Sequence, residues 1–364
     1  MIYRLLAKSY TRTIVAALVA LVFSIVITSI VLSVSGFNPP STFQAMFEFG
    51  KEPDSVVNTV NRAATYYLSA LAVAVGFRMN LFNIGVDGQY RLAAMLAAAV
   101  GGAWALPVVL HQVVIVAVAV AVGGLWAAIA AFLKVTRGVS EVISTIMLNF
   151  IASGVIAFLL NPSRLAAKVA GGNNIGTKPI SPSGRMPGIS YPGSELKLYS
   201  FVLVAALAGF AFWYMINRTR FGFDLRATGL SQSAAAASGV DAKRMVVIAM
   251  CMSGAIAGLV GMPQLLGGSY SYSLDFPTGI GFTGIGIALL GRNSPVGIAF
   301  ASLLWAFLDQ SSQILDFNDI PKEIVAITQA AVLLSVVVVY EIVNRVGKRI
   351  DQRHVAAQLG EVPA

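Results

Sequence analysis

The sequence predicts an all-α polytopic membrane protein with about ten transmembrane helices. Of its 364 residues, 57% are hydrophobic and only 11% are charged, whereas soluble proteins carry about 25% charged residues. The apolar residues form long runs, and a bilayer-spanning helix needs about 20 of them. The single cysteine, Cys251, rules out an internal disulfide framework. Such a chain is suited to a lipid bilayer and not to a water-soluble core.

Ten apolar segments are candidates for crossing the bilayer. The segments 90–106 and 278–290 are short, so whether they cross it fully is left open. Pro107 separates the third segment from the fourth, because proline cannot continue a helix. The candidate spans are 14–34, 57–77, 90–106, 110–133, 141–160, 200–216, 245–266, 278–290, 295–313 and 323–343.

The positions of lysine and arginine predict that both termini are cytoplasmic. In that orientation 17 of the 25 basic residues lie inside and 8 lie outside. Two connecting loops are long, one outside at 161–199 and one inside at 217–244. The outside loop is rich in Gly, Pro, Ser and Asn, so it either caps or docks something or is a tolerated insertion.

The stretch Gly76–Ala94 concentrates polar side chains between two apolar runs, and glycines interrupt it. At membrane depth such a segment must be buried in protein or line a wet cavity. Ionisable groups there indicate a pathway or a binding site. We therefore predict that Asn83, Asp87 and Gln89 line a substrate pathway. The alternative is a solvated cytoplasmic turn.

A polar stripe follows one face of the segment 141–160. Its residues recur at four-residue spacing and are Glu141, Thr145, Asn149 and Ser153. We predict that Asn149 and Thr145 also line the pathway, although Ser and Thr commonly join helices inside membranes. Gln264 in the seventh span and Thr283 in the eighth are further candidates.

The inside loop predicts a helix of about two turns. Ser231 can cap its first turn, and Gly239 can adopt the left-handed conformation that ends it. Alanines make this helix slim enough to enter a groove on a partner, and basic residues flank it. The alternative is a linker that faces lipid headgroups.

A weak internal symmetry relates residues 57–160 to residues 245–343. The stretch 76–94 has a looser counterpart in GFTGIGIALLGRNSPVGIAFAS. Because the first set of spans begins outside and the second begins inside, such a repeat would be inverted. The whole chain, 1–364, is predicted to form one transmembrane domain.

Several function classes have no support in the sequence. There is no Walker A motif, no H-E-x-x-H and no G-x-S-x-G. His111 and His354 lie far apart and are interpreted as boundary residues, so we expect no metal site and no catalytic residues. The net charge of +9 fits membrane orientation better than nucleic-acid binding, because basic and aromatic residues do not interleave.

Three stretches together resemble one family of transport proteins. NLFNIGVDGQ, EVISTIMLNFIA and LRATGLSQSAAAASGV are similar to the permease subunits of bacterial ABC importers for nucleosides and simple sugars. This branch also contains the ribose and branched-chain amino-acid permeases. The resemblance covers roughly residues 10–345. The first motif is usually written with Glu where this chain has Asp87.

This resemblance implies a type II ABC importer permease fold in the bacterial inner membrane, working by alternating access. The implied partners are ABC ATPase subunits, a second and shorter permease in a heterodimer, and an extracytoplasmic substrate-binding lipoprotein. No cofactor is implied, since ATP is hydrolysed by the partner. The inside loop would couple to the ATPase through Arg226, Gly229, Ser231, Ala235, Ala236 and Gly239, although Ala235 or Ala236 replaces the Glu usual in that family motif.

One alternative function is an ATP-independent secondary transporter or channel for a small polar solute. An inverted repeat suits it, but Asp87 is the one acid within the candidate pathway, and no relay of acids and histidines is visible. A membrane-embedded enzyme would need a paired acid and base or a metal set, which the sequence does not offer.

Overall fold

The computed structural model describes residues 9–168, 174–318, 320–321 and 323–335, together with residues 338, 342, 345 and 346. These residues are mostly helical and fall into two compact units. One unit is Pro53–Phe307, and the other combines the residues up to Glu52 with those from Leu308 onward. The terminal basic clusters used to predict orientation, and His354, lie largely or wholly outside the described residues.

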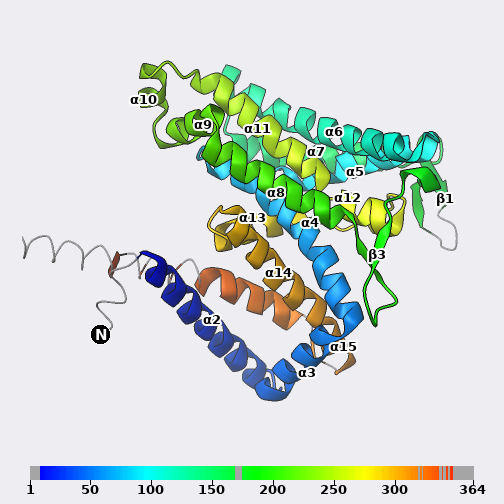
Figure 1. Ribbon diagram of the computed structural model, residues 1–364, viewed down its shortest axis with the longest axis vertical. Helices are drawn as coiled ribbons and strands as arrows, with labels where there is room; N and C mark the ends of the chain where they lie inside the picture. The colour runs from blue at the N-terminus through cyan, green and yellow to red at the C-terminus, as the bar shows by residue number, and fades with distance from the viewer. Residues whose placement is uncertain are drawn as a thin grey trace, which may run out of the picture. The chain divides into compact units, whose positions relative to one another are not determined.

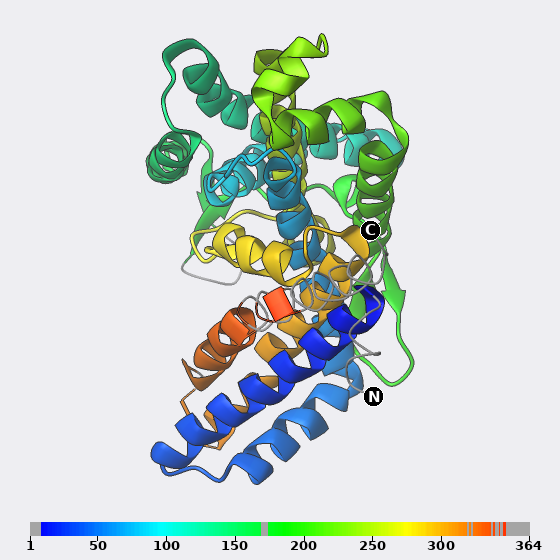
Figure 2. The same ribbon diagram turned by 90° about the vertical axis from the view of Figure 1, so that its left-hand side faces the viewer.

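The larger unit is a bundle of helices, shown in two views in Figures 1 and 2. Helix α11 packs along α6 and α4, while α13 packs against α4, and α5 against α6 and α7. Its main helices are α4 (Pro53–Phe77), α5 (Val86–Ala103), α6 (Val108–Arg137), α7 (Glu141–Leu159), α8 (Phe201–Arg218), α9 (Arg220–Leu230), α10 (Gln232–Ala237), α11 (Ala242–Leu259), α12 (Met262–Gln264), the π-helix η2 (Leu265–Ser269), α13 (Ile280–Leu290) and most of α14 (Pro295–Ser311).

Each predicted span overlaps a helix, and most of the boundaries shift by only a few residues. The third span is α5, which begins at Val86 and ends at Ala103, so it starts earlier than predicted. Among the described residues, four helical segments are long and apolar enough to cross a membrane, and the bent pair Val22–Val34 with Pro39–Lys51 would be a fifth. The four are Val108–Arg137, Glu141–Leu159, Phe201–Arg218 and Ala242–Ser269.

The smaller unit is built from α2 (Ser9–Val34), α3 (Pro39–Lys51), α15 (Gln313–Phe317) and a helix at Glu323–Ser335. The two N-terminal helices meet at 115°. Two prolines at the start of α3 suit the first turn of a helix, where a backbone N–H has no partner to lose. The core of this unit includes Leu32, Met46, Leu315 and Ile324.

Helices α6 and α11 approach closely because small residues face each other. A Cβ atom on Gly123 would lie 2.2 Å from the carbonyl oxygen of Gly254. A Cβ atom on Gly258 would lie 2.1 Å from the carbonyl oxygen of Ala119. Small residues at four-residue spacing allow helices to pack this closely in membranes. Close packing matters there because the hydrophobic effect does not drive helices together in lipid. This is the most extensive contact between two described helices of the larger unit.

The outside loop docks onto the segment after α11. It contains two antiparallel hairpins, in which Ala166–Lys168 (β1) pairs with Ile175–Thr177 (β2) and Gly188–Ser190 (β3) pairs with Lys197–Tyr199 (β4). The N–H of Ile180 donates to the carbonyl of Tyr270 (2.7 Å), and that of Met186 donates to the carbonyl of Leu266 (3.0 Å). The loop therefore docks on this chain's own backbone, which favours the docking interpretation over a tolerated insertion.

Segments that the orientation prediction assigns to one side of the membrane contact one another. At one end, the outside loop touches α5, where Ser181 N–H donates to the carbonyl of Gly101. At the other, Arg78 Nη2 donates to the carbonyl of Asn293 (2.7 Å), and Asn80 Nδ2 donates to the carbonyl of Gly229 (3.0 Å). These contacts group the outside loop with the end of α5, and the turns after α4 and α13 with the end of α9, while the orientation across the membrane stays a prediction.

Candidate functional site

The helical path breaks between α4 and α5, as the polar stretch predicts. Asn80 has a φ of 53°, and the carbonyl of Gly76 accepts hydrogen bonds from the N–H groups of Met79 and Leu81. The predicted pathway residues of this stretch are not solvated: Asn83 is 1% exposed and Gln89 is 0% exposed. For these residues the solvated-turn alternative is therefore excluded.

Asn83 and Gln89 form a closed amide pair. Asn83 Nδ2 donates to Gln89 Oε1 (2.9 Å), and Gln89 Nε2 donates back to Asn83 Oδ1 (3.0 Å). Asn83 Nδ2 also donates to Ser253 Oγ (2.8 Å), and that hydroxyl donates to the carbonyl of Ala72. A buried polar group needs such partners, since leaving one unpaired costs about 1–3 kcal/mol. The pair fastens the start of α5 to α4 and α11.

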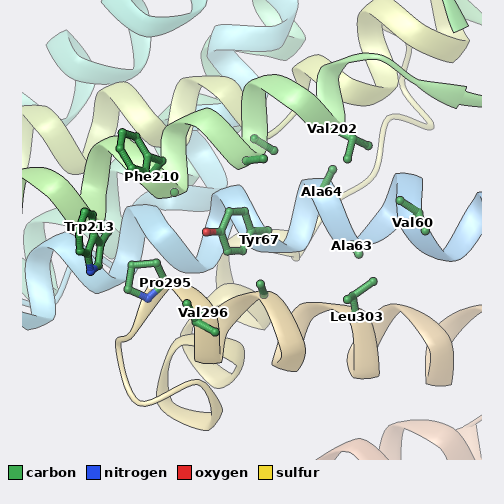
Figure 3. Close-up of a pocket in the computed structure, with 14 residues that line it drawn as sticks. Val60, Ala63, Ala64, Tyr67, Val202, Phe210, Trp213, Pro295, Val296 and Leu303 are labelled. Atoms are coloured by element: carbon green, nitrogen blue, oxygen red, sulfur yellow. The ribbon is translucent and has the colours of Figure 1, made fainter. Parts of the chain in front are cut away.

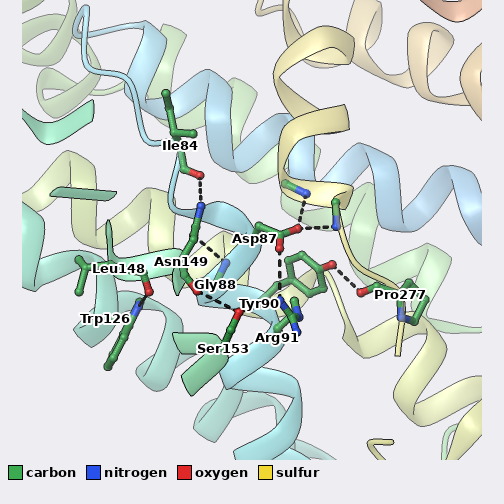
Figure 4. A network of polar contacts seen from close by, with 12 residues as sticks. Ile84, Asp87, Gly88, Tyr90, Arg91, Trp126, Leu148, Asn149, Ser153 and Pro277 are labelled. Atoms are coloured by element: carbon green, nitrogen blue, oxygen red, sulfur yellow. Dashed lines mark hydrogen bonds and ion pairs between the residues drawn. The ribbon is translucent and has the colours of Figure 1, made fainter. Parts of the chain in front are cut away.

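Asp87 connects α5 with the start of α13 (Figure 4). Its Oδ1 accepts hydrogen bonds from the N–H of Gly279 (2.8 Å) and, more weakly, of Gly281 (3.4 Å). A carboxylate is favoured there, because the N-terminus of a helix carries partial positive charge. Arg91 Nη1 lies 3.7 Å from the other carboxylate oxygen. This buried acid therefore has a cation on one side and a helix start on the other.

The polar stripe of α7 faces the start of α5. Asn149 Nδ2 donates to the carbonyl of Ile84 (2.9 Å), and its Oδ1 accepts from the N–H of Gly88 (2.8 Å), as Figure 4 shows. Ser153 Oγ accepts from Arg91 Nη1 (3.1 Å). Thr145 is fully buried and donates to the carbonyl of Glu141, one turn earlier. Five of the predicted pathway residues therefore lie close together, namely Asn83, Asp87, Gln89, Thr145 and Asn149.

A polar cavity of about 420 Å³ lies at the end of the larger unit where the outside loop docks. Of the predicted pathway residues, Gln264 lines it and Thr283 does not; Thr283 donates to the carbonyl of Gly279 within α13. The contribution of α4 was not predicted, although the stretch NTVNRAATYY places several polar residues in its N-terminal half. The polar and aromatic residues that line the cavity include Asn58, Arg62, Thr65, Tyr66, Tyr199, Gln264 and Thr278.

The wall that β4 contributes to this cavity is fixed by a buried asparagine. Asn61 Oδ1 accepts from the N–H of Tyr199 (2.8 Å), and Asn61 Nδ2 donates to the carbonyl of Lys197 (3.1 Å). Burial, followed by the neighbouring Tyr270, raises the pKa of Tyr199. Its phenol therefore stays protonated at neutral pH and can both donate and accept hydrogen bonds.

A second cavity, of about 660 Å³, lies between α4, α8 and α14 and is almost entirely apolar (Figure 3). Tyr67 projects between the helices, with Phe210 and Trp213 on α8 and Val296 on α14 around it. A polar solute here would lose hydrogen bonds to water that this lining cannot replace. The two cavities therefore differ in the chemistry of what they can hold.

The inside loop forms two short helices. Ser231 Oγ accepts from the N–H of Ala234 and so caps α10, and Gly239 has a φ of +85°, both as predicted. Helix α9, at Arg220–Leu230, was not predicted. Ala235 is buried against the rest of the protein, whereas Ala236 is exposed.

The loop is anchored on the body of the larger unit. The backbone of Arg78 and Met79 packs against Gly229, and Arg226 Nη1 donates to the carbonyl of Ile216. Two apolar side chains nevertheless point into open space: Leu230 is 89% exposed and Phe223 is 63% exposed. The loop is thus a fixed projection that presents apolar surface.

A multi-pass helical bundle with buried polar contacts at breaks in its helices, and with an anchored projecting loop, has the features of a membrane permease. The chain belongs to the family described as "branched-chain amino acid transport system / permease component", whose model matches residues 55–339. It is accordingly a multi-pass protein of the inner membrane.

Several similar proteins are permease proteins of ABC transporters. The guanosine ABC transporter permease protein NupP of Bacillus subtilis is 34% identical over 91% of this chain and 95% of its own. The nucleoside ABC transporter permease protein NupB of Lactococcus lactis is 30% identical over 96% and 98%. The glucose ABC transporter permease protein TsgB13 of Haloferax volcanii is 32% identical over 75% and 73%. No solved structure matches the chain.

Proposed function

We propose that this chain is the transmembrane permease subunit of an ATP-driven ABC importer for nucleosides. The observation that carries the proposal is the similarity, over more than nine-tenths of both chains, to permeases named for guanosine and for nucleosides. A ribose-type sugar is the second candidate substrate, because a shorter match is to a permease named for glucose. The subunit itself is non-catalytic, and ATP hydrolysis belongs to a partner.

The proposed architecture is a type II importer fold with ten spans, an inverted repeat and both termini in the cytoplasm. The turn between α4 and α5 and the turn between α13 and α14 both lie on the proposed cytoplasmic side, so they do not bear on an inverted repeat, which would relate turns on opposite sides. Asn80 in the first turn has a positive φ, as do Arg292 and Asn293 in the second. The two turns also touch, through the hydrogen bond from Arg78 to Asn293.

We propose that the buried polar residues shape the transport path by fixing where the helices break. The residues concerned are Asn83, Asp87, Gln89, Thr145 and Asn149, and they hold together α4, α5, α7, α11 and the start of α13. Alternating access requires elements that take two discrete arrangements. Of the predicted pathway residues, Gln264 lines the polar cavity and is proposed to meet substrate directly, while Thr283 lies within α13.

The inside loop is proposed as the contact for the ABC ATPase. The exposed Leu230 and Phe223 offer apolar surface on an element held rigid by Ser231 and Arg226. Burial of such side chains at an interface is favourable at about 25 cal/mol per Å². A shorter second permease and an extracytoplasmic binding lipoprotein complete the proposed complex.

Deletion of Ser231–Ser238 tests this assignment. The variant should be made in the chain co-expressed with its ATPase, second permease and binding protein. We expect it to reach the membrane but to lose co-purification of the ATPase, and Leu230→Ser should weaken that association in the same direction. The exposed Leu203 of α8 provides the control Leu203→Ser, which should keep it. ATPase retained at the wild-type level by the deletion variant would refute the coupling role.

A further inference from the structure

The structure points to the polar cavity as a binding site for a neutral nucleoside, and we propose that imported solute occupies it. This inference rests on the proposed function and adds to it a location and a mode of recognition. The cavity lies between the outer half of α4, strand β4, the junction of α11 with α12 and the segment that leads into α13. Its volume of about 420 Å³ falls within the range of sites for small molecules.

The charges of the lining select a neutral ligand. Asn58, Thr65, Gln264 and Thr278 contribute amides and hydroxyls, which can both donate and accept hydrogen bonds. Arg62 is the one cation of the lining, and the described residues that line the cavity include no Asp or Glu. A cationic solute would therefore find no carboxylate among the lining residues, whereas a neutral base and its ribose would meet hydrogen-bonding partners.

Aromatic side chains give the cavity a surface on which a base can stack. Tyr66, Tyr199 and Phe276 all line it. Phe276 is held in place by its ring contact with Tyr272, at 4.8 Å between centroids, and Tyr199 by Asn61. Stacking of one base on an aromatic ring contributes about 1–3 kcal/mol. A free pentose has no base to stack on these rings, so the lining favours the nucleoside over its sugar.

The floor of the cavity connects with the buried network of α5. Pro277, Thr278 and Ile280 line the cavity. Behind them, Tyr90 Oη donates to the carbonyl of Pro277 (2.6 Å), and Asp87 accepts from the N–H of Gly279 (2.8 Å). Asp87 is therefore a positioning residue, which fixes this segment from the side away from the ligand.

Thiol protection in the assembled importer tests the location. The background is Cys251→Ala, which removes the only native cysteine. The exposed Thr278 at the cavity is changed by Thr278→Cys, and the exposed Ser163 of the outside loop by Ser163→Cys as the control. Each purified complex is treated with a methanethiosulfonate reagent, alone and with guanosine, uridine, D-ribose or choline at millimolar concentration.

We expect both nucleosides to slow modification of the Thr278→Cys thiol by at least about fivefold, the protection given by an occluding solute at about four times its Kd. Ribose should protect less, choline should not protect, and the Ser163→Cys thiol should react at an unchanged rate. Equal reaction rates with and without nucleosides would overturn the proposal, as would equal protection by ribose and guanosine.

Uptake kinetics separate this proposal from the proposed function. Gln264→Ala should raise the KM for guanosine about fivefold to tenfold with little change in kcat, because it removes hydrogen bonds to the bound solute. Thr278→Val should act in the same direction, and Thr136→Val, at the far end of α6, should not. If the Gln264→Ala complex imports guanosine with ATP and an unchanged KM, the cavity is rejected as the binding site, and the proposed importer function stands. Failure of the wild-type complex to import any nucleoside with ATP would reject the importer itself.

Discussion

The backbone N–H of Gly279 donates a 2.8 Å hydrogen bond to the carboxylate of Asp87, across 192 residues of sequence. This contact joins the first turn of α5 to the first turn of α13 and leaves Asp87 only 6% exposed. Since a helix N-terminus favours negative charge, the acid stabilises the start of α13 more than a neutral acceptor would. The same contact fixes the segment that forms the floor of the polar cavity.

Asp87→Ala should lower the free energy of unfolding by about 2–3 kcal/mol, because the Gly279 N–H and the Arg91 guanidinium both lose a partner. Asp87→Asn should cost less, about 1 kcal/mol, because it keeps the acceptor oxygen and loses the charge. Thermal unfolding of the purified complex measures both. Equal stability of the alanine variant and the wild type would contradict the capping role.

Asn83 and Gln89 should behave as one unit. Asn83→Ala removes both hydrogen bonds of the buried Gln89 amide, and Gln89→Ala leaves Asn83 bonded only to Ser253 and Gly85, so each should destabilise by about 1–3 kcal/mol. The double variant should cost less than the sum, with a coupling energy of about 0.5–3 kcal/mol. A double-mutant cycle on unfolding free energies gives this number. Strict additivity would show that the two amides do not depend on each other.

The contact between α6 and α11 offers an adjacent pair of glycines for comparison. Gly123→Ala places a Cβ 2.2 Å from the carbonyl of Gly254, whereas on Gly124 the closest atom is 3.3 Å away. Gly123→Ala should therefore destabilise by about 1–3 kcal/mol, the usual cost of overpacking. Gly124→Ala should cost clearly less. Similar melting temperatures for the two variants would mean that the helices separate without strain.

Asp54, in the first turn of α4 and outside the predicted span, gives a pH prediction. Its hydrogen bond from Ser194, with backbone N–H donors nearby, lowers the pKa of this carboxyl from its ordinary value of 3.8. The stabilisation that ionised Asp54 gives the outside loop is therefore complete above pH 3.8. It is lost as the pH falls through the lower pKa that Asp54 has in the folded state. In the wild type, amide hydrogen exchange of residues 194–196 should rise in that acidic range. Asp54→Asn should remove this dependence of exchange on pH.

Local features of the fold were predictable from sequence. Apolar runs located the helices because hydropathy is set by neighbouring residues. Ser231 and Gly239 marked the ends of α10 because capping needs particular side chains within a few positions. The glycines and polar residues of 76–94 likewise predicted the break before α5, which the structure confirms.

Contacts between distant segments were not predictable in this way. From the sequence alone Asp87 was predicted to line the pathway, because no residue near it in the chain indicates that the N–H of Gly279 donates to it. The polar cavity depends on Asn58 and Thr278 coming together, and these lie in separate helical regions. Helix α3 was not predicted, because its polar and apolar residues are mixed and form no apolar run long enough to cross a bilayer. The assignment of Asn83 and Thr145 to a pathway stays a prediction.

ATP-driven uptake of guanosine by the reconstituted complex tests the central claim most directly. Proteoliposomes should contain this chain with its ATPase, second permease and binding protein, with ATP on the side of the ATPase. The account predicts accumulation of guanosine against its gradient that requires ATP and survives dissipation of ion gradients. Uptake that continues without ATP and collapses with an ion gradient would show a secondary transporter and contradict it.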